Sequence, residues 1–319
     1  MIKVLANDGI STTGAEKLES RGFKVLTDHV KQDFLIDYIN KNNIDVILVR
    51  SATKVRKDLI DNCQSIKLIG RGGVGMDNID VDYAKTKGIH VINTPAASSL
   101  SVAELVFAHL FGCVRSLHIS NRNMPLEGDS KFKDLKKSFA KGNELRGKTL
   151  GIVGFGRIGK EVAKIALGIG MKISVYDLSL KETSIELSFF DESTKSFDIK
   201  IDEFNHLIAN SDFITLHVPT QKNYLISENE FKIMKKGVGI INASRGGVID
   251  EVLLSKYLEN GKVSFAALDT YENEPSPKIK ILMNPKISLT PHIGAATIEA
   301  QDRIGIELAD QIIKLLQDV

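Results

Sequence analysis

The chain has 319 residues and a net charge of +2, from 42 lysines and arginines against 40 aspartates and glutamates. That length indicates two domains at about 150 residues each, and the charge balance argues against nucleic acid or an anionic membrane as partner. The hydrophobic share of 43% and charged share of 26% exclude a disordered chain. Cys63 and Cys113 are too few for a disulfide framework or a cysteine-rich metal site. We therefore expect a cytoplasmic protein with buried thiols, no bound metal, no secretory signal and no membrane span.

Short β-branched runs alternate with helical stretches over the first 95 residues, which is typical of βαβ units around a parallel sheet. Gly22 and Gly88 stand where glycines commonly end helices. The predicted strands are Ile2–Ala6, Lys24–Thr27, Asp45–Arg50, Lys67–Gly70 and His90–Asn93.

A long apolar helix is predicted from Ser101 to about Leu117, and a polar, lysine-rich stretch follows from His118 to Arg146. We interpret the helix as a bridge between domains and the polar stretch as a surface excursion or dimer arm. A final helix is predicted over Glu299 to Leu316, although its periodicity does not say where it packs. Between them, six further strands predict a doubly wound nucleotide-binding sheet. They are Thr149–Val153, Lys172–Tyr176, Phe213–Val218, Val238–Asn242, Phe265–Leu268 and Ile287–Leu289.

The first strand of this second half runs into the sequence GFGRIG and then into a helical apolar stripe, the context that a dinucleotide-binding turn requires. Gly154 permits the tight turn, Gly156 lets a pyrophosphate approach the backbone at the helix N-terminus, and Gly159 lets the helix pack closely. Arg157 adds a cation beside the phosphates. Asp177 ends the next strand, where a carboxylate accepts from the ribose hydroxyls, and this favours NAD over NADP. The alternative for GFGRIG is a glycine-rich turn that binds no cofactor, and the alternative for Asp177 is a solvated acid at the end of a strand.

Three polar segments each follow an apolar strand directly. Because the carboxyl ends of parallel strands meet at one edge, we expect these segments to converge on the cofactor. They are Asn242–Gly247 with Arg245, Leu268–Pro275 with Glu274, and Leu289–Gly294 with His292.

Their side chains suit hydride transfer between NAD and a 2-hydroxy acid. The imidazole of His292 can take or return the hydroxyl proton, Glu274 can fix its tautomer, and Arg245 can hold the substrate carboxylate. Taken singly, His292 has an alternative reading as a loop histidine and Glu274 as a solvated acid.

Eight motifs follow one another along almost the whole chain. They are VRSATKV at 49–55, GRGGVGMDN at 70–78, NTP at 93–95, AEL at 103–105, GFGRIG at 154–159, NASRGG at 242–247, LDTYENEP at 268–275 and TPHIGAAT at 290–297. In this order they resemble the D-isomer-specific 2-hydroxyacid dehydrogenase family. The resemblance implies an α/β fold of two doubly wound parallel-sheet domains, a Rossmann NAD-binding domain (99–291) inserted into a flavodoxin-like substrate domain (1–98 and 292–319).

The resemblance also implies roles for single residues. Arg245, Glu274 and His292 match the family's catalytic arginine, glutamate and histidine. The implied cofactor-binding residues are Gly154, Gly156, Arg157, Ile158, Gly159, Asp177, His217, Pro219, Ala243, Ser244, Asp269, His292 and Gly294, with Asp269 at the nicotinamide carboxamide. The implied substrate-binding residues are Arg50, Ser51, Arg71, Gly73, Val74, Gly75, Arg245 and His292, with the amides around Val74 on the substrate carboxylate.

Two arginines point to the substrate. In family members that oxidise 3-phospho-D-glycerate at the entry to serine synthesis, the residues matching Arg50 and Arg71 face the phosphate, and we predict this reaction here. Surface arginines are the alternative reading. Two departures from that subgroup are Val74, where human-type enzymes carry threonine, and a longer segment from Ser179 to Asp202.

Other functions stay open. A glyoxylate/hydroxypyruvate reductase or a D-lactate dehydrogenase would share the triad, and an NAD-sensing corepressor would use the fold to bind a partner protein. The family further implies a homodimer. Because the chain ends with the closing helix, it resembles the short form without regulatory domains, and we expect no serine feedback through such domains.

Overall fold

The computed structural model describes residues 1–317, which form two compact units. The first unit consists of Met1–Ser101 together with the chain from Ala295 onward, and the second of Val102–Gly294. The chain passes from the first unit to the second after Ser101 and returns after Gly294, and each boundary lies three residues beyond the one expected from sequence. The second unit is therefore an insertion within the chain of the first.

The first unit is built on a five-stranded parallel sheet with the order β2-β1-β3-β4-β5, the flavodoxin-like arrangement. All five predicted strands are confirmed, with ends that move by a residue or two. They are β1 (Lys3–Ala6), β2 (Lys24–Leu26), β3 (Val46–Val49), β4 (Leu68–Arg71) and β5 (His90–Asn93). The helices before the crossing are α1 (Thr12–Glu19), η1 (Gln32–Phe34), α2 (Leu35–Asn42), α3 (Lys57–Asn62) and α4 (Val81–Thr86).

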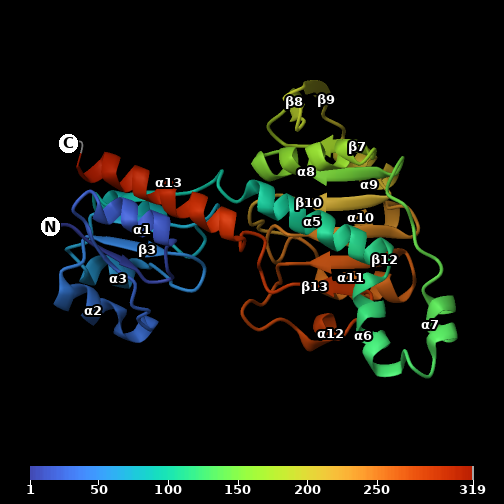
Figure 1. The fold of residues 1–319 in the computed structure, drawn as a ribbon, viewed down its shortest axis with the longest axis horizontal. Coiled ribbons are helices and arrows are strands. Elements are labelled where there is room, and N and C mark those ends of the chain that lie inside the picture. The colour runs from blue at the N-terminus through green and yellow to red at the C-terminus, as the bar shows by residue number, and fades with distance from the viewer. Residues whose placement is uncertain (318–319) are drawn as a thin grey trace. The chain divides into compact units, whose positions relative to one another are not determined.

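The last helix, α13 (Ile298–Leu316), packs in the first unit beside α1, red beside blue in Figure 1. A Cβ on Gly14 would lie 2.7 Å from backbone atoms of Gly305, so both glycines are needed for the two helices to approach. Ile304 and Leu308 join the apolar core on this face of the sheet. The buried face of α13 therefore packs on a sheet whose strands lie some 200 residues earlier in the chain. The periodicity of the sequence did not reveal this partner.

The second unit has a six-stranded parallel sheet with the order β13-β12-β11-β10-β6-β7. The first strand of the unit, β6, has the second strand on one side and β10 on the other, so the strand order reverses beside β6. Such a switch point is where doubly wound sheets bind ligands. All six predicted parallel strands are confirmed: β6 (Thr149–Val153), β7 (Lys172–Tyr176), β10 (Phe213–Leu216), β11 (Val238–Asn242), β12 (Val263–Leu268) and β13 (Ile287–Leu289).

Helices cover both faces of this sheet, and alternate strand residues supply the two cores. α5 (Ser99–Val114) and α8 (Arg157–Gly168) contribute to one apolar cluster. The opposite cluster receives residues of α9 (Phe204–Asn210), α10 (Glu228–Ile233), α11 (Glu251–Glu259) and α12 (Ile279–Leu282).

The region expected as one long helix and a surface excursion contains three helices. α5 ends at Val114, because Ser116 adopts a left-handed backbone with φ of 52° that a helix cannot continue. The polar stretch then forms α6 (Leu117–Glu127) and α7 (Phe132–Ser138). Across the described residues no single helix has the length and apolarity of a membrane span; α5 and α6 reach that level only when taken together, with a 57° bend.

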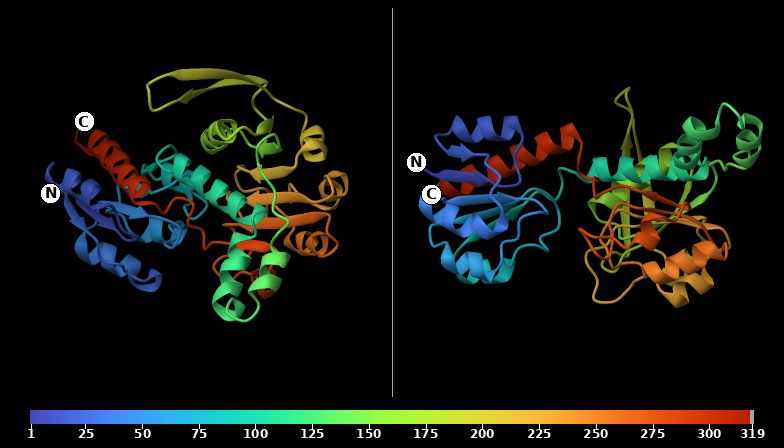
Figure 2. Two further views of the ribbon diagram at one scale, coloured as in Figure 1. Left: turned by 45° about the vertical axis from the view of Figure 1, so that its right-hand side comes forward. Right: turned by 90° about the horizontal axis from the view of Figure 1, so that it is seen from below.

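The longer segment after Asp177 is a hairpin that the sequence analysis did not predict. β8 (Glu182–Ser188) and β9 (Thr194–Lys200) pair in antiparallel register and stand out from the second unit in Figure 2. Ile185 and Leu187 alternate with polar residues, so one face of the hairpin packs on α8 while the other stays exposed. The segment is thus an ordered insertion.

Candidate active site

The glycine turn lies at the switch point of the second sheet. Gly154 has φ of 91°, and a Cβ on it would collide with the carbonyl of His217 at the end of β10. A Cβ on Gly159 would collide with the carbonyl of Gly154, so this glycine lets α8 pack against the turn. Gly156 is the N-cap of α8, with nothing within 4 Å of a Cβ built on it. Arg157 and Ile158 form the first helical turn, so this space opens onto the helix N-terminus.

Asp177 ties the end of β7 to the glycine turn. Its Oδ2 accepts from the amide of Phe155 at 2.8 Å, and its Oδ1 accepts from the amide and the hydroxyl of Ser179 at 2.9 and 2.7 Å. Partial burial opposes ionisation, but these hydrogen bonds outweigh it and hold the pKa of Asp177 below its ordinary value. The Asp177 carboxylate is therefore ionised at neutral pH, and the order β10-β6-β7 places it two strands from His217, with the Gly154 turn between them.

His217 is half-buried beside that turn, and Pro219 follows it in the loop after β10. Burial lowers the pKa of His217 to about 3, so its imidazole is neutral. Its Nε2 lies 2.9 Å from the hydroxyl of Thr215, whereas its Nδ1 has no hydrogen-bond partner among residues 1–317. A buried ring nitrogen without a partner is costly, and it marks this edge of the turn as a place where a polar ligand atom would supply the missing hydrogen bond.

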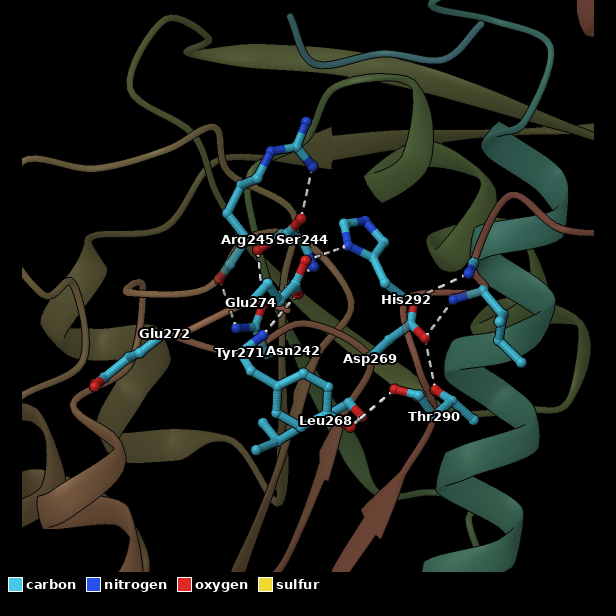
Figure 3. Close-up of polar contacts among 12 residues, drawn as sticks. Asn242, Ser244, Arg245, Leu268, Asp269, Tyr271, Glu272, Glu274, Thr290 and His292 are labelled. Carbon is cyan, nitrogen blue, oxygen red and sulfur yellow. Dashed lines mark hydrogen bonds and ion pairs between the residues drawn. The ribbon is translucent and has the colours of Figure 1, made fainter. Parts of the chain in front are cut away.

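Arg245 stands on a loop that Asn242 shapes. The Asn242 side chain accepts from the amide and hydroxyl of Ser244 and donates to the carbonyl of Arg245 at 2.9 Å. The guanidinium of Arg245 in turn donates to the carbonyl of Ser244 at 2.7 Å, as Figure 3 shows. Ala243 completes this turn. Sequence analysis did not single out Asn242, although an asparagine whose side chain accepts from the amide two residues on is a recognised turn former.

Glu274 and His292 form a direct pair. Oε2 of Glu274 lies 2.9 Å from Nδ1 of His292, and Oε1 accepts from the amide of Tyr271. Burial opposes ionisation of Glu274, but His292, the Tyr271 amide and Arg245 together hold its pKa below the ordinary value. An ionised Glu274 can only accept, so Nδ1–H of His292 donates the hydrogen bond, and in this tautomer Nε2 is the ring nitrogen that can accept a proton. The predicted convergence of Arg245, Glu274 and His292 is therefore present.

Asp269 fastens the loop that carries His292. It is 2% exposed and its Oδ1 accepts from the hydroxyl of Thr290 and the amide of Ile293, while Oδ2 accepts from the amide of Gly294 at 2.9 Å. A carboxylate has about four acceptor positions, so one remains on Oδ2 for the carboxamide contact expected from sequence. The contacts in this structure add a second role, because they bracket His292.

The two remaining arginines belong to the first unit. Arg71 ends β4 and Arg50 follows β3 directly, and these strands are neighbours whose residues Val49 and Arg71 are in register. Burial lowers the pKa of Arg50 while Asp8 opposes that shift, and a guanidinium keeps its charge in such surroundings. Asp8 also accepts from the Arg50 amide at 2.7 Å, which fixes the backbone before Ser51.

Both arginine side chains lie against the glycine-rich loop that follows β4. A Cβ on Gly73 would collide with the guanidinium of Arg71, and one on Gly72 would lie 3.8 Å from Cγ of Arg50. The amide of Gly73 donates to the hydroxyl of Thr94 at 2.8 Å. An amide has one proton, so Gly73 is committed to Thr94, and only the amides of Val74 and Gly75 are left for the carboxylate contact expected from sequence.

Comparison with known proteins places this geometry in a family. Residues 107–294 match the model of the D-isomer specific 2-hydroxyacid dehydrogenase, NAD binding domain. The chain is 42% identical over 320 residues to hydroxypyruvate reductase of Thermotoga maritima, with 98% of each chain covered. The chain belongs to the D-isomer-specific 2-hydroxyacid dehydrogenase family.

Other members of the family agree in fold and differ in name. D-3-phosphoglycerate dehydrogenase of Methanocaldococcus jannaschii is 38% identical over 99% of this chain, but the chain spans only 58% of that protein. A crystal structure of a glyoxylate reductase from Paecilomyes thermophila has a TM-score of 0.81 and 29% identity, covering 99% of this chain and 95% of the other. The predicted family, the two-domain α/β fold and the NAD-binding domain are confirmed, and the chain is a 2-hydroxyacid dehydrogenase whose substrate these names do not decide.

Proposed function

We propose that this dehydrogenase oxidises 3-phospho-D-glycerate to 3-phosphohydroxypyruvate, reversibly and with NAD. The choice of substrate rests on one observation, the pair of arginines Arg50 and Arg71. They lie at the ends of adjacent strands and against one glycine-rich loop. A phosphate dianion suits two guanidinium groups that hold their charge. Reduction of an unphosphorylated keto acid would have no need of both.

The glycine turn supports NAD as the group bound in the second unit. Gly156 leaves open space at the N-terminus of α8, where a pyrophosphate is stabilised by amides and the helix dipole. The buried Nδ1 of His217 lacks a partner among the described residues beside the same turn, and Asp177 offers a carboxylate to ribose hydroxyls. Bound NAD supplies the hydride acceptor for C2 of the substrate.

The protein's own groups then account for the proton and the charge. Nε2 of His292 takes the hydroxyl proton at C2, and Glu274 stabilises the imidazolium that results. Arg245 holds the carboxylate and polarises the developing carbonyl. In the reverse direction, the same Nε2 returns the proton to the carbonyl oxygen.

Hydroxypyruvate or glyoxylate reduction is the second candidate, favoured by the 42% identity to a hydroxypyruvate reductase along both full chains. D-Lactate oxidation would use the same triad. Initial rates with 3-phosphoglycerate, glycerate and lactate, and in reverse with phosphohydroxypyruvate, hydroxypyruvate and glyoxylate, separate these reactions. We expect kcat/KM to be highest for the phosphorylated pair. Preference for an unphosphorylated acid refutes the proposed substrate, and binding of NAD without turnover of any acid favours a sensor.

Two variants test the phosphate contact itself. Arg50→Ala combined with Arg71→Ala is expected to lower kcat/KM for the phosphorylated substrate by about 100-fold, at roughly 1.4 kcal/mol per lost charged hydrogen bond. It should leave turnover of hydroxypyruvate nearly unchanged. Arg56→Ala, which removes an arginine of the same unit paired with Asp80, is the matched control. Equal losses on all substrates would remove the phosphate role.

We further propose a homodimer formed through α6 and α7, working in the cytosol at the first step of serine synthesis. Leu117, Leu126 and Phe132 are 62%, 78% and 57% exposed on these helices, an apolar surface that a second copy would bury. Light scattering after size-exclusion chromatography tests this, since Leu117→Lys with Leu126→Lys should yield monomers. The buried thiols of Cys63 and Cys113 suit a reducing compartment.

A further inference from the structure

The hydrogen bonds around the His292 loop continue into the core, to a histidine on α5. His109 is 5% exposed, in a stretch of α5 whose neighbouring residues are apolar. Its Nδ1 lies 2.9 Å from the hydroxyl of Ser288, and its Nε2 lies 3.0 Å from the hydroxyl of Thr290. Oγ1 of Thr290 is in turn 2.6 Å from Oδ1 of Asp269. A continuous polar chain therefore connects α5 with the carboxylate that brackets His292.

Elementary bonding rules give this chain one direction. A carboxylate can only accept, so the single hydroxyl proton of Thr290 is donated to Asp269. The hydroxyl oxygen must then accept from Nε2–H of His109, and this tautomer leaves Nδ1 to accept from Ser288. Burial lowers the pKa of His109, opposed by Asp269 and reinforced by His118, which agrees with a neutral ring.

We propose that His109 is a positioning residue that fixes the loop of His292 through Thr290 and Asp269. The loop needs such a hold, because Pro291, His292 and Ile293 are all exposed and little packing restrains them. His292 also has φ of 55°, a left-handed backbone that costs energy in residues other than glycine. The proposal rests on the acid–base role proposed above for His292.

Loss of the His109 donor has a specific consequence. Without this donor the Thr290 hydroxyl can rotate, and its hydrogen bond no longer fixes Oδ1 of Asp269 in one position. That position is the one in which Oδ1 also accepts from the Ile293 amide. His292 would sample positions away from the reacting proton. Arg245 stands on a separate loop and would still bind the substrate carboxylate. Loss of the His109 donor should therefore lower kcat and leave KM for the keto acid nearly unchanged.

Four variants test this. His109→Leu and Thr290→Val each cut the same link and are expected to lower kcat by about 10-fold, within the range for small misplacements of a catalytic group, while KM changes less than about two-fold. Thr290→Ser keeps the hydroxyl and should retain kcat. Leu110→Ala, a fully buried neighbour on α5, should lower the melting temperature without lowering kcat. If His109→Leu does not fold, Thr290→Val decides.

Amide hydrogen exchange supplies a readout that does not depend on activity. The Ile293 and Gly294 amides, which donate to Asp269, should exchange faster in His109→Leu and Thr290→Val than in Leu110→Ala. If the wild-type protein turns over no 2-hydroxy acid, the proposed function is refuted. Amide hydrogen exchange would still decide whether His109 positions the His292 loop. Unchanged exchange at both amides, or unchanged kcat in an active enzyme, overturns the proposal.

Discussion

Replacing Glu274 by glutamine tests the catalytic pair most directly. The variant keeps the shape of the side chain and an acceptor for the Tyr271 amide, but removes the charge 2.9 Å from Nδ1 of His292. At about 4 Å between charges and an effective dielectric constant of about 20, an imidazolium gains roughly 4 kcal/mol from the carboxylate. His292 and Glu274 are 39% and 35% exposed at their side chains, and solvent screening halves this to about 2 kcal/mol.

A loss of about 2 kcal/mol in the transition state corresponds to roughly a 30-fold fall in kcat. Steady-state NADH formation with saturating substrate measures it. Glu272→Gln is the matched control, because this neighbouring acid contacts Lys278 and the Glu251 amide and is expected to keep kcat near the wild-type value. A Glu274→Gln enzyme within about three-fold of wild type would refute the electrostatic account, since screening would then have removed most of the expected gain.

Three other outcomes follow from the same contacts. Asp177→Ala should raise KM for NAD by about 10-fold and lower the ratio of kcat/KM for NAD to that for NADP, because it removes the proposed charge-assisted contact with the ribose. Gly159→Ala should lower the free energy of unfolding by about 1–3 kcal/mol in a denaturant titration, since its Cβ would meet the Gly154 carbonyl; Gly168→Ala, on the same helix with open space, should not. Burial opposes ionisation of Asp212, but the Thr149 amide and Lys235 outweigh it and hold its pKa below the ordinary value. That stability is present above the unfolded pKa of about 3.9 and is lost as pH falls below it, so Asp212→Asn should flatten the acid limb of a Tm–pH curve.

The strand pattern and the site motifs were predictable from sequence for one physical reason. Residues of a parallel strand are buried on both faces and read as apolar runs, and the polar segments after them must lie at one sheet edge. Arg245, Glu274 and His292 therefore converge as expected, although they stand in three different motifs. The break at Ser116 was not predictable, because it is a backbone conformation without a glycine or proline to mark it.

The sequence analysis also missed two residues that act through others, Asn242 and His109, for different reasons. The role of Asn242 is a turn within four residues, and its local signal was available. His109 is different, because it lies some 180 residues from Thr290 and reads as one polar residue in an apolar helix. Only the packing of α5 near β13 makes it part of the site. The hairpin after Asp177 was visible in the alternation of Ile185 and Leu187 with polar residues, but the sequence analysis noted only the greater length of this segment.

The double crossing of the chain has a consequence for synthesis. The face of the first sheet that α13 covers includes Val4, Leu48 and Leu68, and these residues leave the ribosome long before α13 does. At about 5–20 residues per second, translation of the inserted unit takes roughly 10–40 s. During that interval the inserted unit can complete its own core, whereas the first unit holds an apolar face without its cover. We expect the nascent first unit to need protection from aggregation until residue 316 has emerged.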